Sequence, residues 1–183
     1  MGVDPGLSRC GVGVIEGSVA RPTVVRAGVI RTDVAAPVAQ RLAVLYDELT
    51  QVIARDTPDA IAVERVFFNA NVRTAMSVGQ AAGVVLLCAA QAGVPITEYT
   101  PTQVKSSVAG YGSADKAQVA YMVRALLRLT EAPKPADTAD ALALALCHLQ
   151  QGVMASTAVQ AAVGTGPTRV PRTAPRTVPR SKS

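Results

Sequence analysis

Histidine and large aromatic side chains are scarce in this chain of 183 residues. It has one histidine, four tyrosines, two phenylalanines and no tryptophan, although 49% of its residues are hydrophobic. We find no plausible Ser-His-Asp set for nucleophilic catalysis around this histidine. His148 lies eight residues after Asp140, about 12 Å along a helix, which is too far to join Asp140 in one site, so we interpret it as a structural or surface residue. With few aromatic residues, we expect a core of Val, Leu, Ile and Ala.

Cysteines and long apolar runs are also few. Cys10, Cys88 and Cys147 are far apart and form no CxxC spacing, which argues against a disulfide framework or structural zinc and fits a reduced cytosol. No basic region followed by an apolar stretch opens the sequence, so we predict no signal peptide. The longest apolar run, Ala81–Ala90, has ten residues, whereas a bilayer requires about 20. We therefore expect a buried helix, a cytoplasmic protein and no contact with a membrane.

Acidic residues are absent from the last segment of the chain, residues 164–183. Residues 1–163 contain 13 of the 18 Lys and Arg and all 13 Asp and Glu, so their formal charges cancel. The last segment holds the other five cations and a proline at every fourth position from Pro167 to Pro179. We predict a folded domain over 1–163 and a disordered basic Pro/Arg-rich tail over 164–183. Such a tail fits either a polyanionic partner or a solubilising role.

Strands and helices alternate along the predicted domain. The predicted strands are Met1–Asp4, Gly11–Ile15, Val24–Ile30, Ala60–Val63 and Pro95–Tyr99. The predicted helices are 37–56, Asn71–Ala92, about Thr102–Val108, Ala114–Leu129 and Ala136–Gln150, with a weaker one over Val153–Val163. Three closely linked strands followed by alternating helices and strands predict an α/β fold. We expect a mixed sheet in which the first three strands are antiparallel and the later ones are added in parallel, with helices on its faces.

Three places put carboxylates where a metal could bind. Asp4 ends the first strand, Glu64 ends the buried fourth strand, and Asp137 and Asp140 share one face at the start of a helix. If the first and fourth strands are neighbours, their side chains meet at one edge of the sheet. Four converging acids would repel one another unless divalent cations were bound. Hard oxygen ligands of this kind suit Mg²⁺, and also Mn²⁺.

Each of these acids also has a simpler structural explanation. Asp-Pro-Gly is a common turn sequence, and Glu64 could mark the exit of a strand to solvent. Acids in a first helical turn, such as Asp137 and Asp140, favour the helix dipole. The joint order of strand Asp, strand Glu and helix Asp-x-x-Asp favours the metal site.

Together these motifs resemble the RuvC-type Holliday junction resolvases. The resemblance lies in residues 2–6 (GVDPG), 62–67 (AVERVF), 103–105 (QVK), 112–119 (GSADKAQV) and 136–142 (ADTADAL). These stretches are collinear and span the chain from its start to about residue 150. Each is weakly specific alone, but the combination is highly specific.

The resemblance implies an RNase H-like fold and a homodimer that resolves four-way DNA junctions by symmetric paired cuts in recombination and repair. It implies Mg²⁺-dependent phosphodiester hydrolysis, for which two metal ions suffice, with Asp4, Glu64, Asp137 and Asp140 as metal ligands. The family's basic residues near the cut phosphate fall on Lys105 and Lys116, and its DNA-contacting aromatic residue falls on Phe67. The resemblance also implies partnership with a junction-binding protein and a branch-migration motor.

Simpler and rival interpretations stay open at this point. Lys105 and Lys116 fit solvated helix positions, and Phe67 fits a buried strand end. The glycines around Asp4 also resemble the first phosphate loop of actin-like sugar kinases and chaperone ATPases, although 183 residues are too few for their second domain. A related RNase H-like nuclease acting on RNA and a non-catalytic junction-binding protein are further alternatives.

Overall fold

The computed structural model describes residues 1–65 and 72–163, with side chains for 1–65 and 75–152. Within these ranges it contains five strands and five helices. The strands are β1 (Gly2–Asp4), β2 (Arg9–Ser18), β3 (Arg21–Arg31), β4 (Ile61–Glu64) and β5 (Ile96–Tyr99). The helices are α1 (Val38–Asp56), α2 (Val72–Ala92), α3 (Pro101–Ala109), α4 (Lys116–Leu126) and α5 (Ala136–Val163). The predicted base-stacking residue Phe67 and the predicted tail over 164–183 lie outside the described residues.

The strands form one mixed sheet in the order β3-β2-β1-β4-β5. The pairs β1–β2 and β2–β3 are antiparallel, whereas β1–β4 and β4–β5 are parallel. The expected mixed sheet, with its antiparallel start and parallel additions, is therefore confirmed. Because β4 adds next to β1, the first and fourth strands are neighbours at the centre of the sheet.

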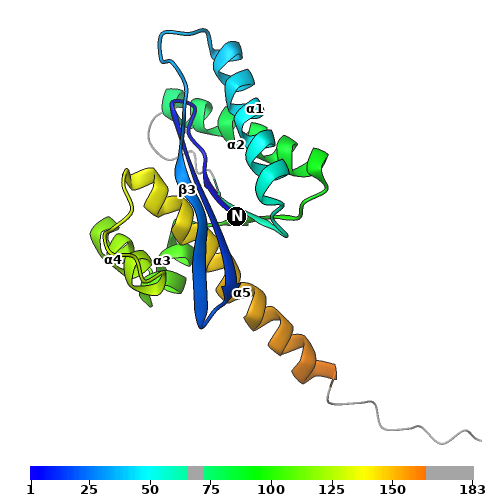
Figure 1. The fold of residues 1–183 in the computed structure, drawn as a ribbon, viewed down its shortest axis with the longest axis vertical. Coiled ribbons are helices and arrows are strands. Elements are labelled where there is room, and N and C mark those ends of the chain that lie inside the picture. The colour runs from blue at the N-terminus through cyan, green and yellow to red at the C-terminus, as the bar shows by residue number, and fades with distance from the viewer. Residues whose placement is uncertain (66–71, 164–183) are drawn as a thin grey trace, which may run out of the picture.

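Helices cover both faces of the sheet, and each face has its own core (Figure 1). Val3, Ile61 and Val63 point into the core under α1 and α2. Ala62 and Tyr99 point into the other core, under α3, α4 and α5. As expected, aliphatic residues and alanine make up most of both cores.

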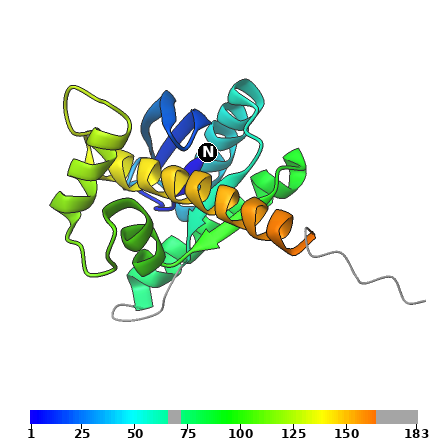
Figure 2. The same ribbon diagram turned by 90° about the horizontal axis from the view of Figure 1, so that it is seen from below.

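Helix α5 is a single helix of 28 residues, where the sequence pattern predicted two. The prediction divided it near Gly152, but this glycine lies within the continuous helix. Figure 2 shows the first part of α5 crossing the sheet and its last part projecting beyond it. The helix contacts β1, β2, β3 and β4, so it packs across most of the sheet.

Helix α2 is less buried than its sequence suggested. Over Ala75–Ala92 it is long and apolar enough to cross a membrane by length and composition alone, with a mean hydropathy of 1.5, yet only 22% of this window is buried. Ala81 and Val85 face the core, whereas Leu86 and Leu87 are 40% and 49% exposed. The expectation of a buried helix therefore holds for one side of α2 only.

Candidate active site

The parallel pairing of β1 and β4 brings Asp4 and Glu64 together. Gly2 pairs with Ala62 and Val3 with Val63, so the next residue of each strand is one of the two acids. Both strands end there, at the carboxyl edge where parallel sheets usually carry their sites. The condition that the first and fourth strands be neighbours is therefore met, and Asp4 and Glu64 leave the sheet at the same edge.

Glycines let the first turn of α5 approach these strand ends. Asp4 pairs with Gly11 of β2, and a Cβ atom added at Gly11 would lie 2.0 Å from the carbonyl oxygen of Asp137. A Cβ atom at Gly2 would likewise lie 2.0 Å from the carbonyl oxygen of Ala141. Any side chain at these positions would push the helix away. Direct contact of α5 with the strand backbone thus places Asp137 and Asp140 beside Asp4.

Electrostatic coupling shows that the acids form one group. The pKa of Asp4 is raised from 3.8 to about 7, first by burial and then by the charges of Asp140, Glu64 and Asp137. Burial also raises the pKa of Glu64, and the charge of Asp140 adds to it. Each carboxylate makes ionisation of the next one harder, so the cluster repels itself when no cation is bound.

Two cations neutralise part of this charge. The ammonium of Lys116 lies 3.2 Å from a carboxylate oxygen of Asp140, and the Asp140 charge raises the pKa of Lys116. The guanidinium of Arg9 pairs with Asp137. Asp4 and Glu64 make no ion pair with any described residue.

Lys105 and Lys116 share a cleft with two of the acids. The cleft has a volume of about 230 Å³, and Glu64, Lys105, Lys116 and Asp140 all line it. Helix α3 begins at a capping box on Thr100, and α4 begins at one on Asp115. These caps set where the two helices start and so where their lysines stand. The structure therefore brings both predicted lysines to the predicted acids.

The structure also bears on the simpler interpretations. Among the described residues, the Asp4 side chain makes no hydrogen bond to the turn that follows it. Asp137, in the first turn of α5, pairs with Arg9, and Asp140, in the next turn, pairs with Lys116; among the described residues neither side chain caps the helix backbone. Glu64 lines the cleft instead of leaving the sheet toward open solvent. His148 is structural, because its Nδ1 lies 2.9 Å from the Tyr99 hydroxyl.

The donor chemistry of the cluster fits hard divalent cations. Within the described part of the chain, no three Asp, Glu, His or Cys side chains are arranged closely enough to hold an ion. Two of the four carboxylates are paired with Arg9 and Lys116 instead. Neighbouring negative charges contribute to the raised pKa of Asp4, and a bound cation would compensate these charges. Oxygen ligands of this kind suit Mg²⁺ and Mn²⁺.

Sequence reasoning missed Arg9 and the packing role of Gly2 and Gly11. The signal for Arg9 was a cation five residues after Asp4, on the strand that returns beside it. The glycines were visible too, but only the docked helix shows why a side chain is excluded there.

The sheet order and the acidic edge define a nuclease of the RNase H-like class of folds. The yeast mitochondrial Holliday junction resolvase Ydc2 has this fold, with a TM-score of 0.63 over 89% of this chain and 84% of that one, at 13% identity. "T. thermophilus RuvC in complex with Holliday junction substrate" aligns with a TM-score of 0.81 and 40% identity, covering 85% of this chain and 94% of that one.

The chain belongs to the RuvC family of crossover junction endodeoxyribonucleases. The family described as "Crossover junction endodeoxyribonuclease RuvC" matches residues 1–148. The relative from Frankia casuarinae is 52% identical over 170 residues, which cover 92% of this chain and 98% of the relative. The relative from Salinispora arenicola is 54% identical over 153 residues, or 83% and 87% of the two chains.

Proposed function

We propose that this chain is an endodeoxyribonuclease that resolves four-way DNA junctions by symmetric paired cuts during recombination and repair. The observation that carries this function is the placement of Asp4 and Glu64 at neighbouring strand ends, where the charges of Asp137 and Asp140 act on Asp4. Lys105 and Lys116 line one cleft with Glu64 and Asp140. Membership of the RuvC family supports it. The rival nucleotide-binding and RNA-processing functions draw no support from these relatives.

We propose that Asp4, Glu64, Asp137 and Asp140 hold two Mg²⁺ ions, for which Mn²⁺ can substitute. When bound, the ions activate the attacking water and offset negative charge at the phosphate and the leaving oxygen. Metal ions require ionised carboxylate ligands. The pKa of Asp4 is raised to about 7 by burial and by neighbouring charges, so Asp4 must lose its proton to serve as a ligand.

The lysines then act on the DNA. The ammonium of Lys116 pairs with Asp140 in the metal-free chain, and we propose that it turns to a phosphate oxygen when a metal takes over this carboxylate. Lys105 lines the same cleft and lowers the pKa of Glu64. It has no ion pair with a described carboxylate, so it can hold the cut phosphate without giving one up. Phe67 remains our candidate for stacking on a base at the crossover.

The function is tested with a synthetic four-way junction, a linear duplex and an RNA hairpin of matched length, each incubated with the protein and Mg²⁺. We expect paired nicks at symmetric positions of the junction and little cutting of the other two. Preferred cutting of RNA would favour the RNA-processing rival. Tight junction binding without any cutting, in Mg²⁺ or Mn²⁺, would favour the non-catalytic one.

We propose that the protein is a homodimer, because a junction with two-fold symmetry needs two matched active sites. Helix α2 supplies a suitable surface. Met76, Leu86 and Leu87 are 60%, 40% and 49% exposed on it. Among the described residues, nothing lies within 4 Å of a Cβ atom built at Gly79 or Gly83. Small residues of this kind let two helices approach closely.

Light scattering should give twice the mass of the 18.8 kDa chain. Leu87→Glu should shift this dimer to monomer, because a charge on the apolar face of α2 would be buried in the interface. Val34→Glu is the matched control, since Val34 is 73% exposed and lies in the loop between β3 and α1 rather than on α2. A wild-type monomer, both free and on junction DNA, would contradict the proposal.

We propose that residues 1–163 form the nuclease domain and that the basic segment 164–183 adds affinity without specificity. Its five cations can contact phosphates, and such contacts do not distinguish a junction from a duplex. Deleting 164–183 should weaken binding to both and lower the salt dependence of log K by at most about 4–5 per chain. Salt titrations on both DNAs, with cut sites mapped in parallel, measure this. An unchanged salt dependence would contradict a role in DNA binding.

We further propose that the protein acts in the cytoplasm with a junction-binding protein and a branch-migration motor. This proposal rests on the resemblance to the RuvC-type resolvases. The described residues show no binding site that can be assigned to either partner.

A further inference from the structure

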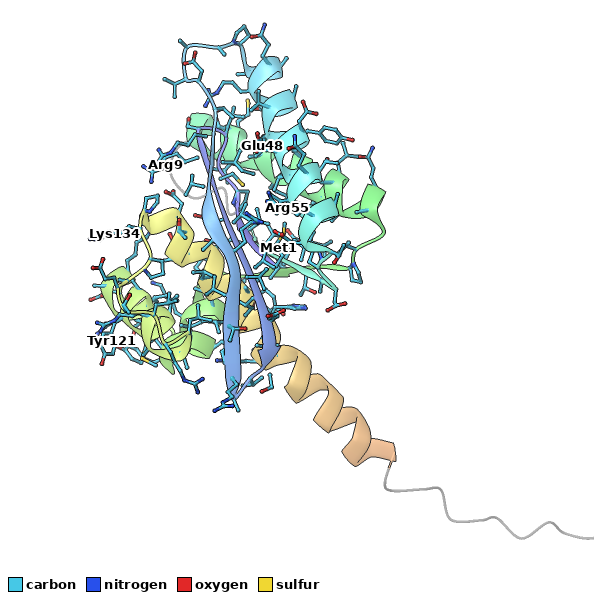
Figure 3. All side chains as sticks on the ribbon, viewed as in Figure 1. Met1, Arg9, Glu48, Arg55, Tyr121 and Lys134 are labelled. Carbon is cyan, nitrogen blue, oxygen red and sulfur yellow. The ribbon has the colours of Figure 1, made fainter. Side chains whose placement is uncertain are left out.

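A second cleft lies beside the acidic cluster, on the other side of Arg9. Its volume is about 420 Å³, and it lies between the loop after β1, the start of α1 and the early turns of α2. Its polar lining side chains are Ser8, Arg9, Arg41 and Ser77, and none of its lining residues is acidic. We call it the Arg41 cleft. Figure 3 shows Arg9 at the edge of the sheet where α5 begins.

Arg41 is held in place by hydroxyl groups rather than by a carboxylate. Its Nε donates to the Thr32 hydroxyl oxygen at 3.0 Å, and a terminal nitrogen donates to the Ser8 hydroxyl oxygen at 2.6 Å. Thr32 in turn donates to the carbonyl oxygen of Leu7. No acidic side chain among the described residues pairs with Arg41. Two hydrogen bonds therefore orient the guanidinium, while no described acidic side chain compensates its positive charge.

The loop beneath Arg41 is tightly folded. A Cβ atom at Gly6 would lie 2.3 Å from the carbonyl oxygen of Arg9, so this turn closes only with glycine there. The turn follows Asp4 directly and carries Ser8 and Arg9 into the wall of the cleft. The cleft and the carboxylate cluster are thus built on the same short loop, and Arg9 lies between them.

We propose that the Arg41 cleft binds a backbone phosphate of the DNA strand next to the phosphate being cut. This inference rests on the proposed function. An immobilised guanidinium with free N–H donors suits a phosphate, because its planar fork matches two phosphate oxygens. After the two hydrogen bonds to Thr32 and Ser8, three of its five N–H donors have no partner among the described residues. Arg9, paired with Asp137, would set the spacing between this phosphate and the acids.

Arg41→Gln tests the proposal through the salt dependence of DNA binding, measured without divalent metal so that the DNA stays intact. We expect the slope of log K against log salt to fall by about 0.9 for each Arg41 that contacts a phosphate, or about 1.8 for a dimer that uses both. Junction and duplex should weaken together. Arg41→Lys should keep the slope, because it keeps the charge. Arg55→Gln, at the far end of the same helix, is the matched control and should also keep it.

A purely structural role would have a different result. Arg41→Gln and Arg41→Lys would then both weaken binding while the slope stayed at the wild-type value, and this would overturn the proposal. If Arg41→Gln does not fold, the proposal is tested by comparing DNA binding of Val78→Glu and Val78→Gln. Val78→Glu adds a negative charge to the cleft wall and should weaken binding to both DNAs, whereas Val78→Gln should not. Equal binding by these two variants would also overturn the proposal, and a wild-type protein that bound no junction would overturn the proposed function itself.

Discussion

Asp4→Asn, Glu64→Gln, Asp137→Asn and Asp140→Asn should each reduce the rate of junction cleavage by about 100-fold or more while junction binding persists. The reason is that each acid is proposed to hold a metal ion. Metal ligation is worth several kcal/mol in the transition state, and each 1.4 kcal/mol corresponds to about a factor of ten in rate. The carboxylates repel phosphates, so their loss should not weaken DNA binding. The measurement is single-turnover cleavage of a labelled four-way junction, with binding followed by gel shift.

Glu48→Gln is the matched control, because Glu48 is exposed on α1 (Figure 3), a helix that packs in a different core from α5. It should cut at the wild-type rate. If two or more of the four active-site variants cut at near the wild-type rate, the metal site has been assigned to the wrong residues. Unfolding of these variants would instead support the turn and capping interpretations of the acids.

Metal-free protein should lose stability through Asp4 as the pH rises from about 4 to about 7. The pKa of this carboxyl is raised from 3.8 to about 7 in the folded chain, so the folded state binds the proton more tightly than the unfolded state does. The resulting stabilisation is complete below about pH 4 and disappears as the pH passes through 7. A pKa change of this size corresponds to roughly 4 kcal/mol.

Comparison with Asp4→Asn isolates this contribution, since Asn cannot ionise. In urea with a chelator, the variant and the wild type should unfold at similar concentrations at pH 4, and the variant at a higher concentration at pH 8. Adding Mg²⁺ at pH 8 should stabilise the wild type more than the variant. Equal unfolding of the two at pH 8 without metal would mean that Asp4 does not lie in a self-repelling cluster. Glu48→Gln should show no such dependence on pH.

The strands and the candidate acids could be predicted from local patterns. The compact apolar run Ala60–Val63 predicted a strand buried on both faces, and β4 is buried in this way. The three-residue spacing of Asp137 and Asp140 predicted that both would share a helix face. The extent of α5 could not be predicted in this way, because Gly152 and the small residues after it give weak local signals.

The convergence of the site depended on long-range packing. Asp4 and Asp140 are far apart in sequence, and only the order β2-β1-β4 with α5 docked on Gly2 and Gly11 brings them together. Local sequence patterns contain no information on the distance between residues that are far apart in the chain. For the same reason neither the pairing of Arg9 with Asp137 nor the support of Arg41 by Ser8 and Thr32 could be predicted.

The sequence by itself determined which chemical groups this protein has and the family to which it belongs. It supplied oxygen ligands for hard cations and two lysines for phosphates. Tertiary structure alone decided which charges meet: Arg9 with Asp137, Lys116 with Asp140, and Asp4 with no cation partner among the described residues. The pKa of a carboxyl depends on its burial and on its distance from other charges, and the ligand that a cleft binds depends on the same two properties. These distances and this burial exist only once the sheet and α5 have packed together.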